Sequence, residues 1–498
     1  MRSARPVAGR GRIAPDCNST ETPMSKTRIL PSISAAVVAF VWGVLTPPSV
    51  YVLRRQDIIN NSSSTDYPPL PYPLPTYTPC TSSNLDNYLH TAPVNGLHIV
   101  CVSPLHLGAD GMEEQLPQSN DAQEQYATIN KVESLRLTFY KGSSSPPIIL
   151  QEKVGGRRTT NGVDGVGAGK KGADSIDWQE MRVQFYAQLG LVPEGKLQQP
   201  WAVFTPTGER IVGDSDLVTS GDGIGSNQYI MSNIIASGMI IVTQGGNWVW
   251  PGVREGFQRN VSLSSSSGTT KSLNVTIETL SMKPLVLSIQ GFLTDEECDH
   301  IAEKAAPNMQ YSGVTLKDND IGKAANNWRT SQSTFLSAKN DPILTDIEHR
   351  TASLTRVPRN HQEYVQVLRY GFTEKYDAHH DFFDPAQYQS DPNTLNLIEY
   401  GKKNRFATVF WYLTDVEDGG HTIFPRAGGL PPMMNFADCS RGLKVKPQKG
   451  KVIIFYSLDA SGARDELSLH GACPVGEGNV KWAANKWVWN APMGYITS

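Results

Sequence analysis

Residue types that bind metals lie two positions apart at His379 and Asp381, and another histidine, His470, follows 89 residues after the aspartate. Two histidines and one carboxylate form the facial triad that holds Fe(II) and leaves coordination positions open. On a β-strand, residues i and i+2 point the same way, so His379 and Asp381 can share one metal while His380 faces away. The long interval to His470 is suited to a jelly-roll barrel, where a late strand lies beside the first. The pattern predicts a metal centre in a β-barrel.

A lysine and several strand patterns accompany these three residues. Lys481 follows His470 by eleven positions, and its ammonium group can receive the distal carboxylate of a 2-oxo diacid. Alternating apolar runs at residues 363–370, 405–413 and 452–457 predict strands around the metal ligands.

In their order along the chain, these motifs resemble the catalytic domain of prolyl 4-hydroxylases, which are iron- and 2-oxoglutarate-dependent dioxygenases. The likeness covers about Lys283 to Trp489. It begins with residues 284–298, which are similar to the family's first strand and helix, and it includes the motif at 328–331. The resemblance implies an α+β fold for residues 283–498, in which a double-stranded β-helix (jelly roll) carries flanking helices.

The resemblance also implies a role for single residues. The iron ligands are matched by His379, Asp381 and His470. Lys481 matches the lysine that binds the distal carboxylate of 2-oxoglutarate. Hydroxyl groups that contact the same co-substrate are matched by Tyr370 and Thr422. Positions that line the peptide groove are matched by Tyr376, Arg405 and Trp487.

The interval between His470 and Lys481 is one residue longer than is typical of the family. We expect the glycine-rich segment 476–480 to absorb the extra residue in a turn. If it does not, Val480 would face the pocket, and Lys486 is the fallback anchor for the co-substrate.

The implied reaction is oxidative decarboxylation of 2-oxoglutarate to succinate and carbon dioxide, coupled to hydroxylation of a C–H bond by Fe(II) and O₂. L-Ascorbate is the implied reductant. A proline-rich peptide in the polyproline II conformation is the expected substrate, because such peptides dock on aromatic grooves. Such a groove could be formed by Tyr376, Trp411, Tyr412 and Trp487, although about half of such aromatics pack barrels instead. Residues 382–404 form either a substrate-covering loop or a disordered insertion.

Three functional hypotheses follow. The first is a peptidyl-proline 4-hydroxylase of the secretory pathway. The second is a hydroxylase of another substrate, such as peptidyl lysine or a small molecule, because fold and substrate are separable. The third is a barrel that binds without turnover. The sequence leaves the question of a partner subunit open.

The 498-residue chain has room for more than one domain. Its net charge of −3 gives no electrostatic reason to expect nucleic acid as a partner. We expect a basic extension at 1–28, a Pro/Ser-rich stalk at 54–79, an unassigned accessory region at 80–257 and a linker at 258–282. Within the accessory region, residues 177–191 predict a helix, and residues 135–140 and 201–204 predict strands.

Residues 29–53 carry no charge and are long enough to span a bilayer once. We expect a type II signal anchor in the endoplasmic reticulum membrane, with the catalytic domain in the lumen. A cleaved signal peptide is the alternative, which would send the chain to the Golgi or out of the cell. Potential glycosylation sites begin at Asn60, Asn61, Asn260 and Asn274.

Six cysteines are enough for one or two disulfides. We expect Cys80 to pair with Cys101 and Cys439 with Cys473; buried free thiols are the alternative.

Overall fold

The computed structural model describes residues 78–107, 112–115, 134–140, 147–153, 178–190, 201–213, 230, 233–264, 272–322, 324, 326 and 328–493. All of these belong to the compact unit Leu70–Ser498, and the other unit is Met1–Pro69. The expected extension, anchor and nearly all of the stalk lie outside the described residues. Within the described ranges, no helix is both long enough and apolar enough to cross a membrane.

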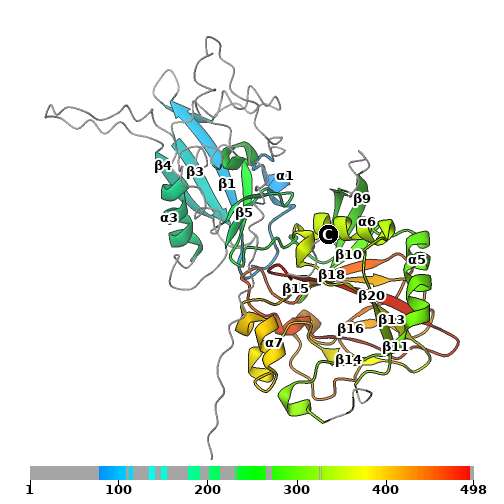
Figure 1. The fold of residues 1–498 in the computed structure, drawn as a ribbon. Helices are drawn as coiled ribbons and strands as arrows, with labels where there is room; N and C mark the ends of the chain where they lie inside the picture. The colour runs from blue at the N-terminus through cyan, green and yellow to red at the C-terminus, as the bar shows by residue number, and fades with distance from the viewer. Residues whose placement is uncertain are drawn as a thin grey trace, which may run out of the picture. The chain divides into compact units, whose positions relative to one another are not determined.

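An antiparallel sheet of nine strands forms the frame of the C-terminal half (Figure 1). Its strand order is β11-β12-β13-β20-β15-β18-β10-β9-β8. The strands are β8 (Gln258–Leu263), β9 (Leu273–Met282), β10 (Leu285–Gln290), β11 (Gln310–Tyr311), β12 (Gln332–Leu336), β13 (Val365–Tyr370), β15 (Arg405–Tyr412), β18 (Val452–Tyr456) and β20 (Lys481–Trp489).

A smaller antiparallel sheet, in the order β14-β19-β16-β17, faces one side of this frame. Its strands are β14 (Tyr376–His379), β16 (Thr422–Phe424), β17 (Leu443–Val445) and β19 (His470–Ala472). One apolar cluster contains residues of both sheets, including Leu368, Phe410, Phe424 and Ile453. We call the space that this cluster fills the barrel interior. Two facing sheets with a shared core are the arrangement expected for the jelly roll.

Helices cover the other side of the nine-stranded sheet. They are α5 (Asp295–Ala305) and α6 (Pro342–Thr355), and Figure 1 shows α6 across the sheet from β14 and β16. Every residue of β18 is buried because Ile453 and Phe455 point into the barrel interior while Ile454 packs in the cluster that includes the helices. A capping box begins α5: the Thr294 hydroxyl accepts from the Glu297 N–H, and the Glu297 carboxylate accepts from the Thr294 N–H.

The segment 382–404 is structured rather than a disordered insertion. It contains η6 (Pro385–Gln387), α7 (Pro392–Leu397) and η7 (Glu399–Gly401). Phe383, Tyr388 and Leu395 form a small core with Trp489 of β20. The other short helices among the described residues are η2 (Ala306–Asn308), η3 (Asp318–Asp320), η5 (Arg359–His361), η8 (Ala427–Gly429) and η9 (Glu466–Ser468).

A third antiparallel sheet lies in the described part of the accessory region, in the order β4-β3-β1-β7-β5-β6, with β2 paired to β1. Its strands are β1 (Leu97–Leu107), β2 (Glu113–Gln115), β3 (Ser134–Tyr140), β4 (Ile148–Lys153), β5 (Ala202–Phe204), β6 (Arg210–Gly213) and β7 (Met239–Thr243). The helices with described bounds in this region are α1 (Ser82–Leu85) and α3 (Trp178–Leu189). One face of β1 and β7 packs with α3, whereas the opposite face, with Ile99 and Ile241, belongs to the same cluster as Leu287 and Leu344 of the C-terminal half.

The structure corrects the expected linker at 258–282. Most of this segment forms β8 and β9, which pair with each other and add to the nine-stranded sheet through β10. The error has a physical cause: the buried face of β9 carries Thr279 and Ser281 beside Val275 and Ile277, so its apolar alternation is diluted.

Both expected disulfides, Cys80–Cys101 and Cys439–Cys473, are present. Among the described cysteines, Cys298 is free and buried.

Candidate active site

The small sheet brings the two histidines of the predicted metal centre together. His379 ends β14, His470 begins β19, and the two are direct partners in the antiparallel pairing. Their ring centroids are 4.6 Å apart. Asp381 follows β14 by two residues, and candidate ligand atoms of all three side chains lie within 4.8 Å of one another. The structure therefore unites the three residues that were expected to hold iron.

The hydrogen bonds around both imidazoles suit a metal. Nδ1 of His379 lies 2.9 Å from the Asp377 carbonyl oxygen, and Nδ1 of His470 lies 2.9 Å from that of Ser468. A carbonyl can only accept, so each Nδ1 carries the proton and each Nε2 has a free lone pair. These Nε2 atoms are 3.7 and 3.5 Å from the two carboxylate oxygens of Asp381. A divalent cation fits between these donors.

Electrostatics hold the ligands in their binding forms. Burial lowers the pKa of His379 to about 3, and the neighbouring His470 contributes, so the imidazole is neutral at neutral pH. Burial alone would raise the pKa of Asp381, but His470, His379 and Arg405 outweigh it and the pKa lies well below its usual range. The Thr408 hydroxyl on β15 also donates to Oδ2 of Asp381 at 2.6 Å.

Lys481 is fully buried at the start of β20, next to Tyr370 of β13. Its Nζ donates to the Gly420 carbonyl at 2.7 Å and lies 5.3–5.6 Å from the ring centroids of Tyr370, Phe410 and Tyr412. Among the described residues, no carboxylate lies within ion-pair distance of the Lys481 ammonium group. Burial lowers the pKa of Lys481 to about 7. A buried ammonium that lacks a counter-ion fits the carboxylate of a ligand.

The fallback anchor, Lys486, is engaged elsewhere. It lies an odd number of positions from Lys481, so on β20 it points to the opposite, helix-covered face. Its Nζ bonds Glu348 and the Glu363 carbonyl, at 2.7 and 2.6 Å. Val480 is 39 % exposed, so the turn before β20 absorbs the extra residue.

The two hydroxyl residues expected near the co-substrate are buried. Thr422 on β16 accepts a 2.7 Å hydrogen bond from the Tyr412 hydroxyl. Burial raises the pKa of the Tyr370 hydroxyl. Tyr370 and Tyr412 border the Lys481 ammonium, while Phe424 and Phe455 of the same cluster border the His470 ring at 5.8 and 4.4 Å. Lys481 and the metal ligands therefore border the same barrel interior.

Aromatic and cationic side chains surround the metal ligands. The ring of Tyr376 stacks on His379 with centroids 3.7 Å apart. The Arg405 guanidinium lies 3.5 Å from the Trp487 ring centroid and makes a two-pronged pair with Glu363 at 2.6 and 3.0 Å. Burial alone would lower the pKa of Arg405, but the Glu363 carboxylate more than offsets this and raises it. Trp411, one of the expected groove aromatics, instead packs on the helix-covered face.

A cavity of about 420 Å³ opens beside His379, and we call it the inner cavity. Its apolar lining includes Leu316, Trp328, Tyr376, Phe382 and Phe436. Sequence reasoning missed Phe436, because the loop around it has no periodic pattern. The sequence also assigned no role to Glu363 or Thr408. The motif at 328–331 was the only sequence signal that indicated Trp328.

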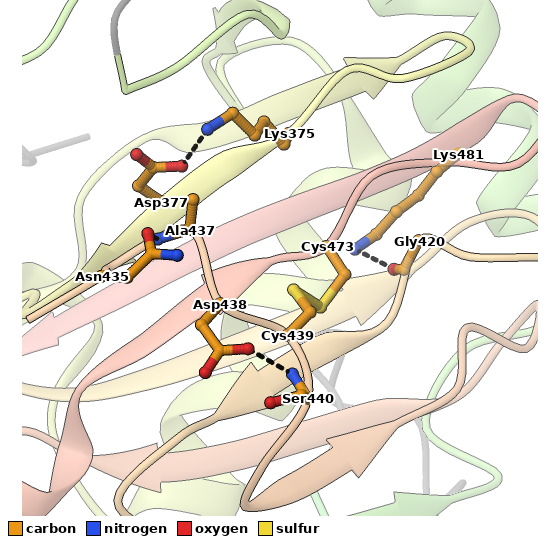
Figure 2. Close-up of a disulfide and its surroundings, with 10 residues drawn as sticks. All are labelled: Lys375, Asp377, Gly420, Asn435, Ala437, Asp438, Cys439, Ser440, Cys473 and Lys481. Carbon is orange, nitrogen blue, oxygen red and sulfur yellow. Dashed lines mark hydrogen bonds and ion pairs between the residues drawn. A yellow bond between two sulfur atoms is a disulfide. The ribbon is translucent and has the colours of Figure 1, made fainter. Parts of the chain in front are cut away.

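The Cys439–Cys473 disulfide ties the loop with Phe436 to the metal-binding strand (Figure 2). Cys473 directly follows β19, and the Phe436 carbonyl accepts from the Ala378 N–H at 2.8 Å. Figure 2 shows Lys481 reaching Gly420 near the same disulfide. The crosslink fixes one wall of the inner cavity.

A family model and two plant relatives agree with this set of site residues. Residues 365–489 match the family model of the 2OG-Fe(II) oxygenase superfamily. The chain is 38 % identical over 240 residues to probable prolyl 4-hydroxylase 4 of Arabidopsis thaliana, covering 46 % of this chain and 76 % of that protein. It is 40 % identical over 220 residues to prolyl 4-hydroxylase 2 of the same plant, covering 43 % and 69 %. A solved viral collagen prolyl hydroxylase from Paramecium Bursaria Chlorella virus-1 is 27 % identical, with a TM-score of 0.29, covering 41 % of this chain and 95 % of that one.

Proposed function

This chain belongs to the prolyl 4-hydroxylase family of iron(II)- and 2-oxoglutarate-dependent dioxygenases, and from that membership we propose that it converts peptidyl proline to 4-hydroxyproline. One observation carries the proposal: a three-residue metal site and a buried cation, Lys481, border the same barrel interior. Iron and 2-oxoglutarate, when bound, supply the activation of O₂. His379, Asp381 and His470 would hold the iron, and Lys481 the distal carboxylate.

The inner cavity supports a proline-rich peptide as the substrate. Its aromatic walls, formed by Trp328, Tyr376, Phe382 and Phe436, suit the apolar faces of a polyproline II helix. Such a helix has little conformational entropy left to lose on binding. The wall side chains would orient the proline ring and exclude water from it.

We place the reaction in the lumen of the secretory pathway, with ascorbate as the reductant. Two disulfides support an oxidising compartment. Two of the potential glycosylation sites, Asn260 on β8 and Asn274 on β9, are exposed. Anchorage by residues 29–53 is part of the same proposal.

The decisive assay incubates the purified chain with Fe(II), 2-oxoglutarate, ascorbate and a (Pro-Pro-Gly)-type or Ser-Pro-rich peptide. We expect succinate together with a peptide that is about 16 Da heavier on proline, the mass of one oxygen atom. Succinate that forms only with a lysine-containing peptide or a small molecule would favour the second hypothesis. An absence of coupled turnover with every substrate would refute the proposal.

A further inference from the structure

A second, larger cavity of about 930 Å³ lies close to the inner cavity, and we call it the outer groove. Its lining includes Tyr400 and Lys402 after α7, Arg464 and Glu466 before β19, and Gly245 and Asn247 after β7. Both the C-terminal half and the accessory region therefore contribute walls.

The two cavities share a wall. Glu466 lines both of them. Phe382 lines the inner cavity, and the guanidinium of Arg464, which lines the outer groove, lies 5.7 Å from its ring centroid. Arg464 also forms an ion pair with Asp384. An extended peptide that leaves the inner cavity past Glu466 would reach the outer groove within a few residues, since polyproline II advances about 3.1 Å per residue.

The accessory sheet is held against this groove by close backbone contact. A Cβ atom on Gly245 would lie 2.5 Å from the Gly462 nitrogen, and one on Gly96 would lie 2.1 Å from the Ser461 nitrogen. The Gly245 N–H donates to the Ala460 carbonyl at 2.7 Å, and the Asn95 amide donates to Asp459 at 2.8 Å. The accessory region is therefore packed tightly against the segment 459–462, which lines the outer groove.

Two side chains of the groove are free to bind a ligand. Tyr400 is 69 % exposed, and three consecutive residues with positive φ, Glu399 to Gly401, hold it outward. Lys402 has no ionic partner among the described residues. The Asp459 carboxylate, by contrast, is used by Asn95, Ser461 and Ala463. The groove therefore offers an aromatic face and an ammonium.

We propose that the outer groove binds the segment of the same proline-rich peptide that flanks the target proline. Tyr400 packs on a flanking proline ring, and Lys402 binds a peptide carbonyl or an acidic side chain. This inference rests on the proposed function, and it gives the accessory region a role in substrate binding.

The test compares two proline-rich peptides, one of about 5 residues that spans about 15 Å and one about three times longer. The variant Tyr400→Asn/Lys402→Ala removes both groups, and Asn tolerates the positive φ at position 400. A matched control, Phe335→Ala/Lys339→Ala, removes an exposed aromatic residue and an exposed lysine from β12 and its following loop, outside both cavities.

We expect KM for the long peptide to rise about five- to tenfold in the groove variant, with kcat unchanged. KM for the short peptide should not change, and the control should match the parent on both peptides. Equal KM values of the parent for long and short peptides, or equal losses on both in the groove variant, would overturn the inference. Failure of the parent to hydroxylate either peptide would instead refute the proposed function.

Discussion

Lys481 links the fold to the chemistry at the level of a single residue. It is fully buried, its Nζ has one protein acceptor, and burial lowers its pKa to about 7. A lowered lysine pKa means that the neutral amine predominates above pH 7, whereas a dicarboxylate binds the charged form. Binding therefore couples to protonation.

We predict that 2-oxoglutarate affinity falls as pH rises through 7, because the amine must first take up a proton. Titration calorimetry of the Mn²⁺-loaded protein, in two buffers that differ in ionisation enthalpy, should show close to one proton taken up at pH 8 and far less at pH 6. Lys481→Met should abolish this uptake. Equal proton counts at both pH values would contradict the assignment.

Lys486 provides the contrast. We predict that Lys486→Met lowers the free energy of unfolding by about 2 kcal/mol, because it removes one of the two cations that pair with the buried Glu348 carboxylate and leaves only Arg359. Denaturant unfolding measures this loss. Affinity for 2-oxoglutarate should stay within about twofold, and a large loss would make Lys486 the anchor.

Thr408→Val tests the residue behind the metal ligands. The change keeps the shape of the side chain and removes the 2.6 Å hydrogen bond to Asp381. We expect metal affinity to fall about tenfold with the fold intact. Competition with a chelator measures the affinity; unchanged binding would show that the hydroxyl has no part in positioning Asp381.

At the scale of elements, a crosslinked loop forms a wall of the site. The Cys439–Cys473 disulfide closes a segment with a sequence separation of 34 and fixes the position of Phe436. We predict that Cys439→Ser/Cys473→Ser lowers the free energy of unfolding by about 3–4 kcal/mol. It should also raise peptide KM more than it weakens metal binding, because both histidines stay on paired strands. Steady-state kinetics and metal titration separate the two effects, and equal losses in both would contradict this view.

The sequence predicted elements where apolar periodicity was strong and failed where it was diluted. The runs at 363–370, 405–413 and 452–457 contain β13, β15 and β18, and α3 lies within the predicted helix at 177–191. β9 was taken for a linker because Thr279 and Ser281 occupy its buried face, which dilutes the apolar alternation. Glu363 was read only as the start of a strand, since its pairing with Arg405 depends on strands far apart in sequence.

At the scale of the whole molecule, the accessory sheet and the C-terminal half share a core. Trp250 is buried; its indole donates to the Leu354 carbonyl at 2.7 Å, and its backbone N–H donates to the Tyr456 hydroxyl at 3.1 Å. Ile99 and Leu287 belong to one cluster. Neither half can keep its apolar residues covered alone.

We predict that residues 78–498 unfold in one cooperative transition, and that a chain beginning at Gln258 is much less stable or insoluble. Scanning calorimetry with circular dichroism measures both. Two separate transitions, or a stable chain from Gln258, would show that the accessory sheet is an independent domain.

The proposed chemistry requires that His379, Asp381 and His470 hold one iron. Anaerobic Fe(II) titration of the parent and of single alanine variants tests this, with His380→Ala as the matched control because that ring stacks on Phe382 and its Nε2 lies 3.1 Å from the Glu466 carbonyl oxygen. We expect one Fe(II) per chain in the parent and in His380→Ala, and a loss of high-affinity binding in His379→Ala, Asp381→Ala and His470→Ala, all of which stay folded. Full Fe(II) binding by any of those three variants would contradict it.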